Sequence, residues 1–155
     1  MTEKLPDAHA AAVEIVQRWI HGDERKDKDL KLGVVADNMV LEIPFNESGR
    51  TEEGHFRRYV GREEIISFID TAFAAEKSVK AIDPEYVVSP DARTVFVEVR
   101  GEVEMVNGKD YRNRYVLRFD IDDGKIVCLK EFYNPIVSAI AFGREIAGQV
   151  TLDHA

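Results

Sequence analysis

The stretch at 123–135, DGKIVCLKEFYNP, joins a turn to a strand and carries a carboxylate at an unexpected place. Residues 122–124, DDG, suit a three-residue hairpin turn with the glycine in the left-handed conformation. Residues 125–133 then have the composition of a strand, which Pro135 brings to an end. Glu131 stands among apolar and aromatic neighbours near the end of this strand. It is therefore either a solvated strand residue or a carboxylate inside a pocket.

The rest of the chain predicts an α+β fold with one mainly antiparallel sheet. Apolar residues recur at helical spacing in some segments and alternate in others, and Asn107-Gly108 is a strong signal for a two-residue hairpin turn. The expected elements are, in chain order, a helix over 8–21, a short helix over 30–35, a strand over 39–45, a polar loop over 46–60, a helix over 61–77, strands over 79–88, 93–106, 109–121 and 125–133, and a short terminal helix over 136–148. We expect the helices to cover one face of the sheet.

Composition narrows the class of protein. The 155 residues are expected to form a single domain over 1–155, and the net charge of -8 argues against a nucleic-acid or anionic-membrane partner. The single cysteine, Cys128, excludes an intramolecular disulfide, and no apolar run resembles a signal peptide or a membrane span. We therefore expect a cytoplasmic protein. No residue spacing suggests a metal site or a phosphate-binding loop, so we expect no cofactor and no metal.

Counting outward from the two turns predicts which side chains are neighbours. With Asn107-Gly108 as the turn, Arg100 lies opposite Tyr115, and with a three-residue turn at 122–124, Glu131 also lies opposite Tyr115. Arg100, Tyr115 and Glu131 then form one row with neighbours ~5 Å apart. The face that they share would also hold Glu98, Glu102 and Tyr133 beside this row, and Phe96, Leu117, Phe119, Val127 and Leu129 toward the other end. An apolar floor with a few convergent polar groups is typical of a small-molecule site.

Two alternatives stay open at this point. The opposite face carries a series of valines, among them Val95, Val97 and Val99, and it could be the one that the helices cover. The charged row would then be a solvated ladder of ion pairs, each contributing little to stability. A two-residue turn at Asp123-Gly124 would in addition move Glu131 to the other face.

The hairpin DGKIVCLKEFYNP, with the apolar segment after it, resembles the C-terminal signature of the nuclear transport factor 2-like superfamily. Within it the chain is most similar to SnoaL-like proteins and to the PhzA/PhzB phenazine-biosynthesis family, with limonene-1,2-epoxide hydrolase and ketosteroid isomerase as more distant relatives. The likeness extends to VADNMVLEIPF at 35–45, RYVGREEIISFI at 58–69 and the segment at 95–126. It implies a cone-shaped, curved sheet of the cystatin-like type, wrapped by N-terminal helices. It also implies a homodimer formed through the outer side of the sheet.

The resemblance carries over to single residues unevenly. Glu131 matches a glutamate taken as a general acid in PhzA/PhzB, and Glu98 and Arg100 match an arginine and an aspartate of the epoxide hydrolase with the charges reversed. A histidine and a serine of PhzA/PhzB correspond here to Phe68 and Ala72. The general-base aspartate of ketosteroid isomerase corresponds to an isoleucine, Ile43. We therefore expect none of these exact activities.

The resulting hypothesis is a cofactor-independent enzyme that acts on a small, mostly apolar carbonyl, hydroxyl or epoxide compound. Glu131 would transfer the proton, Arg100 with Tyr115 would stabilise negative charge, and Glu98 would orient Arg100. The residues expected to bind the substrate are Glu98, Glu102, Leu117, Phe119, Leu129 and Tyr133, with His55 of the polar loop over the mouth. Isomerase, cyclase, dehydratase and hydrolase chemistry all fit this site. The alternative is a non-catalytic ligand-binding or dimerisation module of the same fold.

Overall fold

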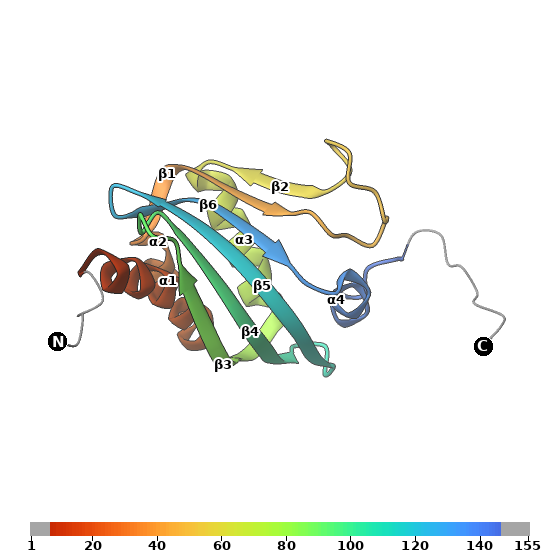
Figure 1. The fold of residues 1–155 in the computed structure, drawn as a ribbon. Coiled ribbons are helices and arrows are strands. Elements are labelled where there is room, and N and C mark those ends of the chain that lie inside the picture. The colour runs from red at the N-terminus through yellow and green to blue at the C-terminus, as the bar shows by residue number, and fades with distance from the viewer. Residues whose placement is uncertain (1–6, 147–155) are drawn as a thin grey trace.

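The structure is a computed structural model that describes residues 7–146 and has the expected α+β architecture (Figure 1). Its elements are α1 (Asp7–Arg25), α2 (Lys28–Leu32), β1 (Val35–Ile43), β2 (Arg57–Val60), α3 (Arg62–Ala75), β3 (Glu76–Val88), β4 (Thr94–Met105), β5 (Asp110–Asp122), β6 (Lys125–Phe132) and α4 (Pro135–Phe142). The prediction of a loop over 46–60 is wrong for its last residues, because β2 forms a short edge strand there. The expected terminal helix stops earlier, and its last residues lie outside the described part of the chain.

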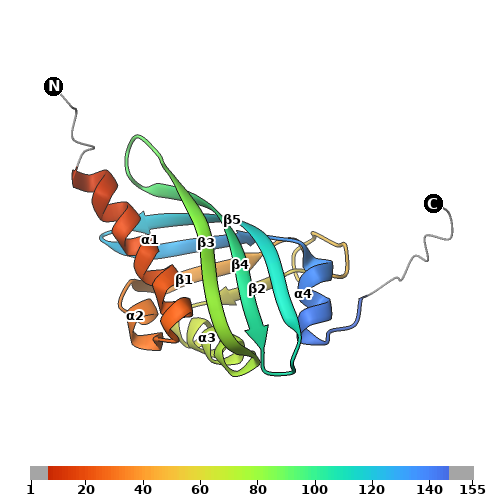
Figure 2. The same cartoon turned by 90° about the horizontal axis from the view of Figure 1, so that it is seen from below.

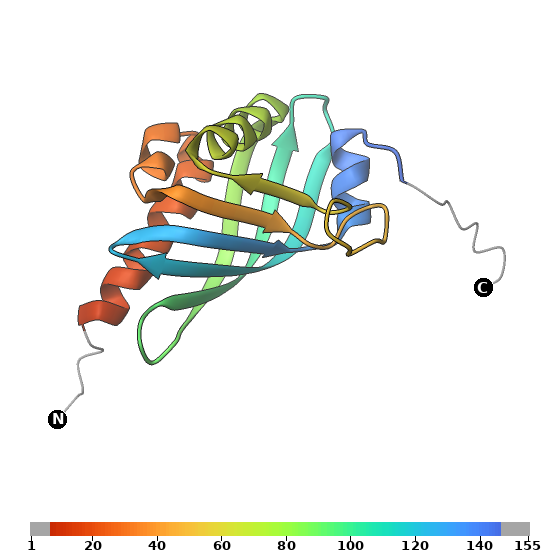
Figure 3. The ribbon, with the colours of Figure 1, turned by 90° about the horizontal axis from the view of Figure 1, so that it is seen from above.

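One six-stranded sheet forms the body of the molecule, in the order β2-β1-β6-β5-β4-β3. Only β1 and β6 pair in parallel, and every other neighbouring pair is antiparallel. The sheet is strongly twisted, so that β1 and β2 run across the direction of β3 and β4 when seen from above (Figure 3). This curvature makes the inner face concave. We define the inner face by Val97 and Val99 of β4 and by Leu117 and Phe119 of β5, all of which are buried.

Helices close the concave side of the sheet. Seen from below, α1 crosses beside β3, with α2 and α3 next to it, and α4 lies at the opposite end near β5 (Figure 2). The apolar stripe of α1 buries Val16, Trp19 and Ile20 against the sheet, as its spacing predicts. Within residues 7–146, no helix has the length and apolar character needed to cross a membrane.

The β4–β5 hairpin has a different turn from the predicted one. The Met105 amide donates to the Lys109 carbonyl at 2.9 Å, which leaves three residues, 106–108, in the loop. Gly108 takes the left-handed conformation there, with φ of +84°. The extra loop residue shifts the register by one, so that Val99 and not Arg100 lies opposite Tyr115. Because strand side chains alternate, the expected face of β4 is wrong throughout.

The β5–β6 hairpin differs from the predicted register in two places, and the two differences cancel in their effect on the face where Glu131 lies. Its turn has two residues, Asp123 and Gly124, both with positive φ, and Asp122 pairs with Lys125. Such a turn alone would move Glu131 to the outer face. Val127, however, is an extra residue in β6, a β-bulge that restores the original alternation. Glu131 therefore lies on the inner face, but opposite Leu117 and not opposite Tyr115.

Candidate functional site

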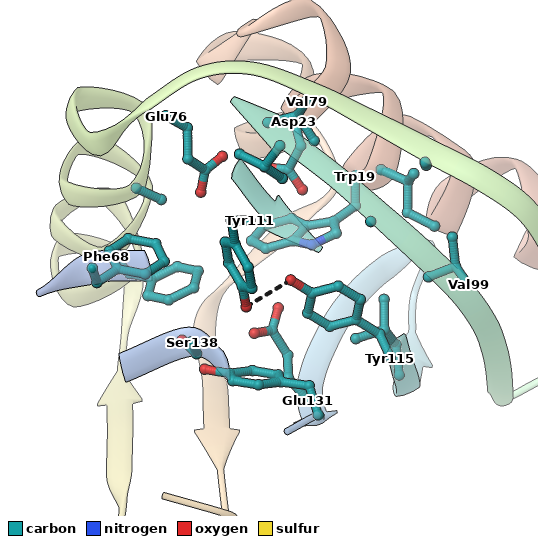
Figure 4. Close-up of a pocket in the computed structure, with 18 of the residues that line it drawn as sticks. Trp19, Asp23, Phe68, Glu76, Val79, Val99, Tyr111, Tyr115, Glu131 and Ser138 are labelled. Carbon is teal, nitrogen blue, oxygen red and sulfur yellow. Dashed lines mark hydrogen bonds between the residues drawn. The ribbon is translucent and has the colours of Figure 1, made fainter. Parts of the chain in front are cut away.

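A cavity of about 190 Å³ lies between the inner face of the sheet and the helices (Figure 4). Its walls come from every helix and from five of the strands, so residues distant in sequence meet there. The lining includes Trp19, Asp23, Lys31, Arg57, Phe68, Ala72, Glu76, Tyr111, Tyr115, Leu117, Glu131, Tyr133, Ser138 and Arg144. Half of these are aromatic or apolar, as is most of the remaining lining, and the polar ones converge on the interior. This composition is that of a small-molecule site.

Glu131 is the carboxylate at the floor of this cavity. It keeps some accessible surface because it faces the cavity, yet protein atoms surround it and exclude bulk water. Burial is the main cause that raises its pKa to about 7, and the charge of Asp23 adds to the effect, whereas Lys31 and Arg57 oppose it. Among residues 7–146, no side chain or backbone group donates a hydrogen bond to this carboxyl group. Glu131 is therefore close to half ionised at neutral pH and free to contact a ligand.

Two tyrosines form a hydrogen-bonded pair beside Glu131. The Tyr115 hydroxyl donates to the Tyr111 hydroxyl oxygen at 2.9 Å, and the Asn113 side-chain amide donates to the same oxygen at 3.1 Å. Burial raises the pKa of both phenols above the ordinary value, so both stay protonated at neutral pH. Since Tyr111 already accepts two hydrogen bonds, its own hydrogen is left to donate. Tyr111 is thus a polarised donor on the cavity wall.

A glycine on β4 makes room for the Tyr115 ring. A Cβ atom added to Gly101 would lie 2.9 Å from Cε2 of Tyr115, which is shorter than real contacts allow. We expect Gly101→Ala to displace this ring, weaken the Tyr115–Tyr111 hydrogen bond and lower the free energy of unfolding by about 1–3 kcal/mol. Urea denaturation measures the loss. In a Tyr115→Ala background the clash is gone, so the same substitution there should cost little; an equal cost in both backgrounds would contradict this explanation.

A second polar cluster, formed by Asp23, Lys31 and Glu76, faces the cavity from the helical side. The Lys31 ammonium forms a salt bridge with the Asp23 carboxylate and lies 3.9 Å from the centre of the Trp19 ring. Burial, followed by the Asp23 charge, raises the pKa of Glu76 to about 7 against the opposing effect of Lys31. Within residues 7–146, no group of three or more metal-ligating side chains is present.

Two arginines stand at the side of the cavity formed by β2 and α4. Arg57 donates through Nη2 to the Tyr133 hydroxyl at 2.6 Å, and its buried Nε has no partner among the described residues. Arg144 donates to Glu47 and to Ser138, each at 2.8 Å. These bonds tie the segment after β1 and the end of α4 to the cavity wall.

Several predicted site residues lie where they were expected. Glu131, Tyr115, Leu117 and Tyr133 all line the cavity. Phe119 and Leu129 share their face but are fully buried in the core, so they support the floor. Phe68 and Ala72 of α3 also line the cavity, which makes that helix an apolar wall.

The predicted roles of Arg100, Glu98 and Glu102 are corrected by the register of β4. Arg100 still borders the cavity, but its side chain lies on the outer face, where its Nη2 is 2.7 Å from an Asp83 carboxylate oxygen. Glu98 is exposed on the same face. Glu102 forms a 3.8 Å ion pair there with Arg112. The reason is the three-residue loop, which inverts the faces of β4 relative to the expected two-residue turn.

His55, predicted to cover the mouth, does not line the cavity and is exposed in the segment between β1 and β2. Sequence reasoning missed Asp23, Lys31, Arg57, Glu76 and Tyr111 altogether. For Tyr111 a signal existed, since it lies four residues before Tyr115 and so shares its face. For Lys31 the signal was Gly22, a glycine inside a helix, which often marks a close approach of another group.

Known proteins resemble this chain both in sequence and in fold. Residues 16–129 match the SnoaL-like domain. The chain belongs to this family. A curated relative, the uncharacterized protein YesE of Bacillus subtilis, is 28% identical over 120 residues, which cover 76% of this chain and 78% of the relative.

Solved structures of the same fold carry several descriptions. A "putative isomerase" from Bacillus subtilis has a TM-score of 0.74 at 25% identity, over 90% of this chain and 97% of the other. The phenazine biosynthesis-related protein PhzB2 of Pseudomonas aeruginosa has a TM-score of 0.74 at 14% identity, over 100% and 94%. A nuclear transport factor 2-like protein from Burkholderia xenovorans has a TM-score of 0.68 at 18% identity, over 86% of this chain and 96% of the other. The expected resemblance to SnoaL-like and PhzB-like proteins is confirmed, and so is the nuclear transport factor 2-like fold.

Proposed function

We propose that this SnoaL-like protein is an enzyme that transfers a proton on a small, mainly apolar substrate with a carbonyl, hydroxyl or epoxide oxygen. Glu131 is the general acid or base. The observation that carries the proposal is the state of this carboxyl group: it faces an aromatic cavity, receives no hydrogen bond from residues 7–146, and has a pKa of about 7. A group with its pKa near the working pH is best suited to exchange a proton.

Tyr111 replaces Arg100 as the group that stabilises negative charge. Its oxygen accepts hydrogen bonds from Tyr115 and Asn113, which makes its own hydrogen a stronger donor to a developing oxyanion. The apolar surroundings strengthen this interaction because they exclude water. Isomerisation, cyclisation and dehydration all need such a donor and a nearby base, so the pair Glu131 and Tyr111 is compatible with each of them.

The proposal is tested with 2-tetralone, an apolar ketone whose α-protons exchange with deuterium once a base removes them. The protein should accelerate this exchange, followed by proton NMR in heavy water. Its rate should rise with pH through about 7 and level off above, because Glu131 must be ionised to accept a proton. Binding of 2-tetralone is seen independently by quenching of Trp19, the single tryptophan, which lines the cavity. Binding without accelerated exchange between about pH 5 and 9 would instead support the ligand-binding module.

Tyr111→Phe should lower the exchange rate by roughly 100-fold while leaving the affinity for 2-tetralone nearly unchanged. The hydroxyl is lost, yet the ring still fills its place in the wall. Tyr115→Phe is the matched control: it removes a donor to Tyr111 but keeps the Tyr111 hydrogen, so the loss should be clearly smaller. Equal losses in the two variants would assign the charge-stabilising role to the pair and not to Tyr111.

Homodimerisation through the outer face of the sheet stays a prediction. Phe45, Phe96 and Val116 are large apolar side chains that are exposed in the single chain, and such groups are typical of an interface. Analytical ultracentrifugation of the protein measures the oligomeric state directly.

A further inference from the structure

The polar cluster of Asp23, Lys31 and Glu76 lies across the cavity from Glu131. In Figure 4 the carboxyl groups of Glu76 and Asp23 enter the cavity from one side, and that of Glu131 enters from the other. Neither the proposed proton transfer nor the likeness to known proteins gives this cluster a role. Charged groups at the wall of an apolar cavity are costly to the fold unless a partner compensates them.

We infer that the substrate carries a second oxygen function, a hydroxyl group, at the far end of its apolar body, and that Lys31 and Glu76 bind it. That the other end of the substrate reacts at Glu131 rests on the proposed function, whereas the binding of the hydroxyl group by Lys31 and Glu76 does not. The substrate class is therefore a small apolar compound with one oxygen function at each end.

The position of Lys31 is built into the packing of the helices. Its side chain is only 2% exposed, and its stem passes α1 where Gly22 leaves a gap. A Cβ atom at Gly22 would lie 2.1 Å from Cγ of Lys31, so no larger residue fits without displacing the lysine. An ammonium group has three hydrogens, and Asp23 is the one carboxylate among the described residues that pairs with it. The remaining hydrogens are available to an oxygen in the cavity.

Glu76 supplies the complementary group. It is the first residue of β3 and its side chain lines the cavity, where no described residue donates a hydrogen bond to it. A hydroxyl group fits between the two side chains because its oxygen accepts from Lys31 while its hydrogen is donated to Glu76. A methyl group in the same place would leave the Glu76 carboxyl group and the remaining hydrogens of Lys31 without a partner.

The space between Glu131 and the pair Lys31 and Glu76 is apolar. Trp19, Phe68, Leu117 and Tyr115 line it, so the body of the ligand gains from leaving water while its ends are held by hydrogen bonds. A cavity of about 190 Å³ is somewhat larger than the ~150 Å³ engineered cavities that take up benzene, which limits the ligand to about one or two small rings.

The test compares 6-hydroxy-2-tetralone with 6-methyl-2-tetralone, which have nearly the same shape and differ only at the far end. Quenching of Trp19 gives the dissociation constants. The unmodified protein should bind the hydroxyl compound roughly tenfold more tightly than the methyl compound, because hydrogen bonds to charged groups contribute more than neutral ones. Glu76→Met should reduce this preference to about twofold or less, and Lys31→Met should do the same. Glu98→Gln, an exposed change on the outer face, is the matched control and should keep the full preference.

Equal binding of the two compounds by the unmodified protein would overturn the inference. A preference for the hydroxyl compound that survives Glu76→Met would overturn it too. If the Lys31→Met variant does not fold, the result for Glu76→Met decides by itself. The proposed function fails separately: if exchange is absent but the hydroxyl preference exists and is lost in the variants, the second binding site stands without the catalytic role of Glu131.

Discussion

Replacing Glu131 by glutamine is expected to lower the exchange rate of 2-tetralone by roughly 100- to 10,000-fold, the range typical of a lost general base. Glutamine has the same shape but cannot accept a proton at neutral pH. Since the amide occupies the same site, the affinity for 2-tetralone, read from Trp19 quenching, should change by no more than about twofold. The rise of the remaining rate with pH through about 7 should also disappear, because the titrating group is gone.

Two comparisons make this result specific to the site. Glu98→Gln changes a glutamate that is exposed on the outer face, and it should leave the exchange rate unaltered. Glu76→Gln changes the other cavity carboxyl group with a pKa of about 7, and its effect on exchange should be far smaller than that of Glu131→Gln. If Glu131→Gln retains more than about a tenth of the rate, the role of general base belongs to another group.

The stability of the protein is expected to fall as the pH rises from about 5 to 8. Glu131 and Glu76 have pKa values of about 7 in the folded protein, raised from 4.5. Below 4.5 both carboxyl groups are protonated in the folded and the unfolded chain, so their contribution is fully present. Above 4.5 the unfolded chain releases protons that the folded chain keeps, and stability is lost until the pH has passed about 7. The loss is about 3 kcal/mol for Glu131 alone.

Urea denaturation at pH 5, 7 and 9 measures this dependence. At pH 9 the Glu131→Gln variant should be more stable than the unmodified protein, because no charge remains to be buried; at about pH 4 the two should be alike. The double variant Glu76→Gln, Glu131→Gln should show the flattest profile. A stability of the unmodified protein that rises over this pH range would contradict the burial of these two groups.

Much of the fold could be predicted from local patterns. The helix over 62–75, the four long strands and the strand that contains Leu41 follow from apolar spacing, because a strand or helix must turn its apolar side toward a core. The inner position of Glu131 was also predicted correctly, but through two errors that cancel: the turn is one residue shorter than expected, and the bulge at Val127 adds one residue back. The likeness of DGKIVCLKEFYNP to the superfamily pointed to the same residue independently.

The faces of β4 could not be predicted in the same way. Asn107-Gly108 is compatible with a two-residue or a three-residue loop, and a difference of one residue moves the Arg100 side chain from the inner to the outer face. The α+β class, most of the elements and the presence of a carboxylate on the last strand follow from the amino-acid sequence, because these depend on spacing along one segment. The three-dimensional arrangement was needed to show that the side chains of Tyr111, Lys31 and Glu76 enter the cavity with it, whereas the Arg100 side chain points to the outer face. Those contacts join segments far apart in the chain, and they depend on the length of a turn, on a bulge and on which side chain fills the gap at Gly22, which apolar spacing along one segment does not specify.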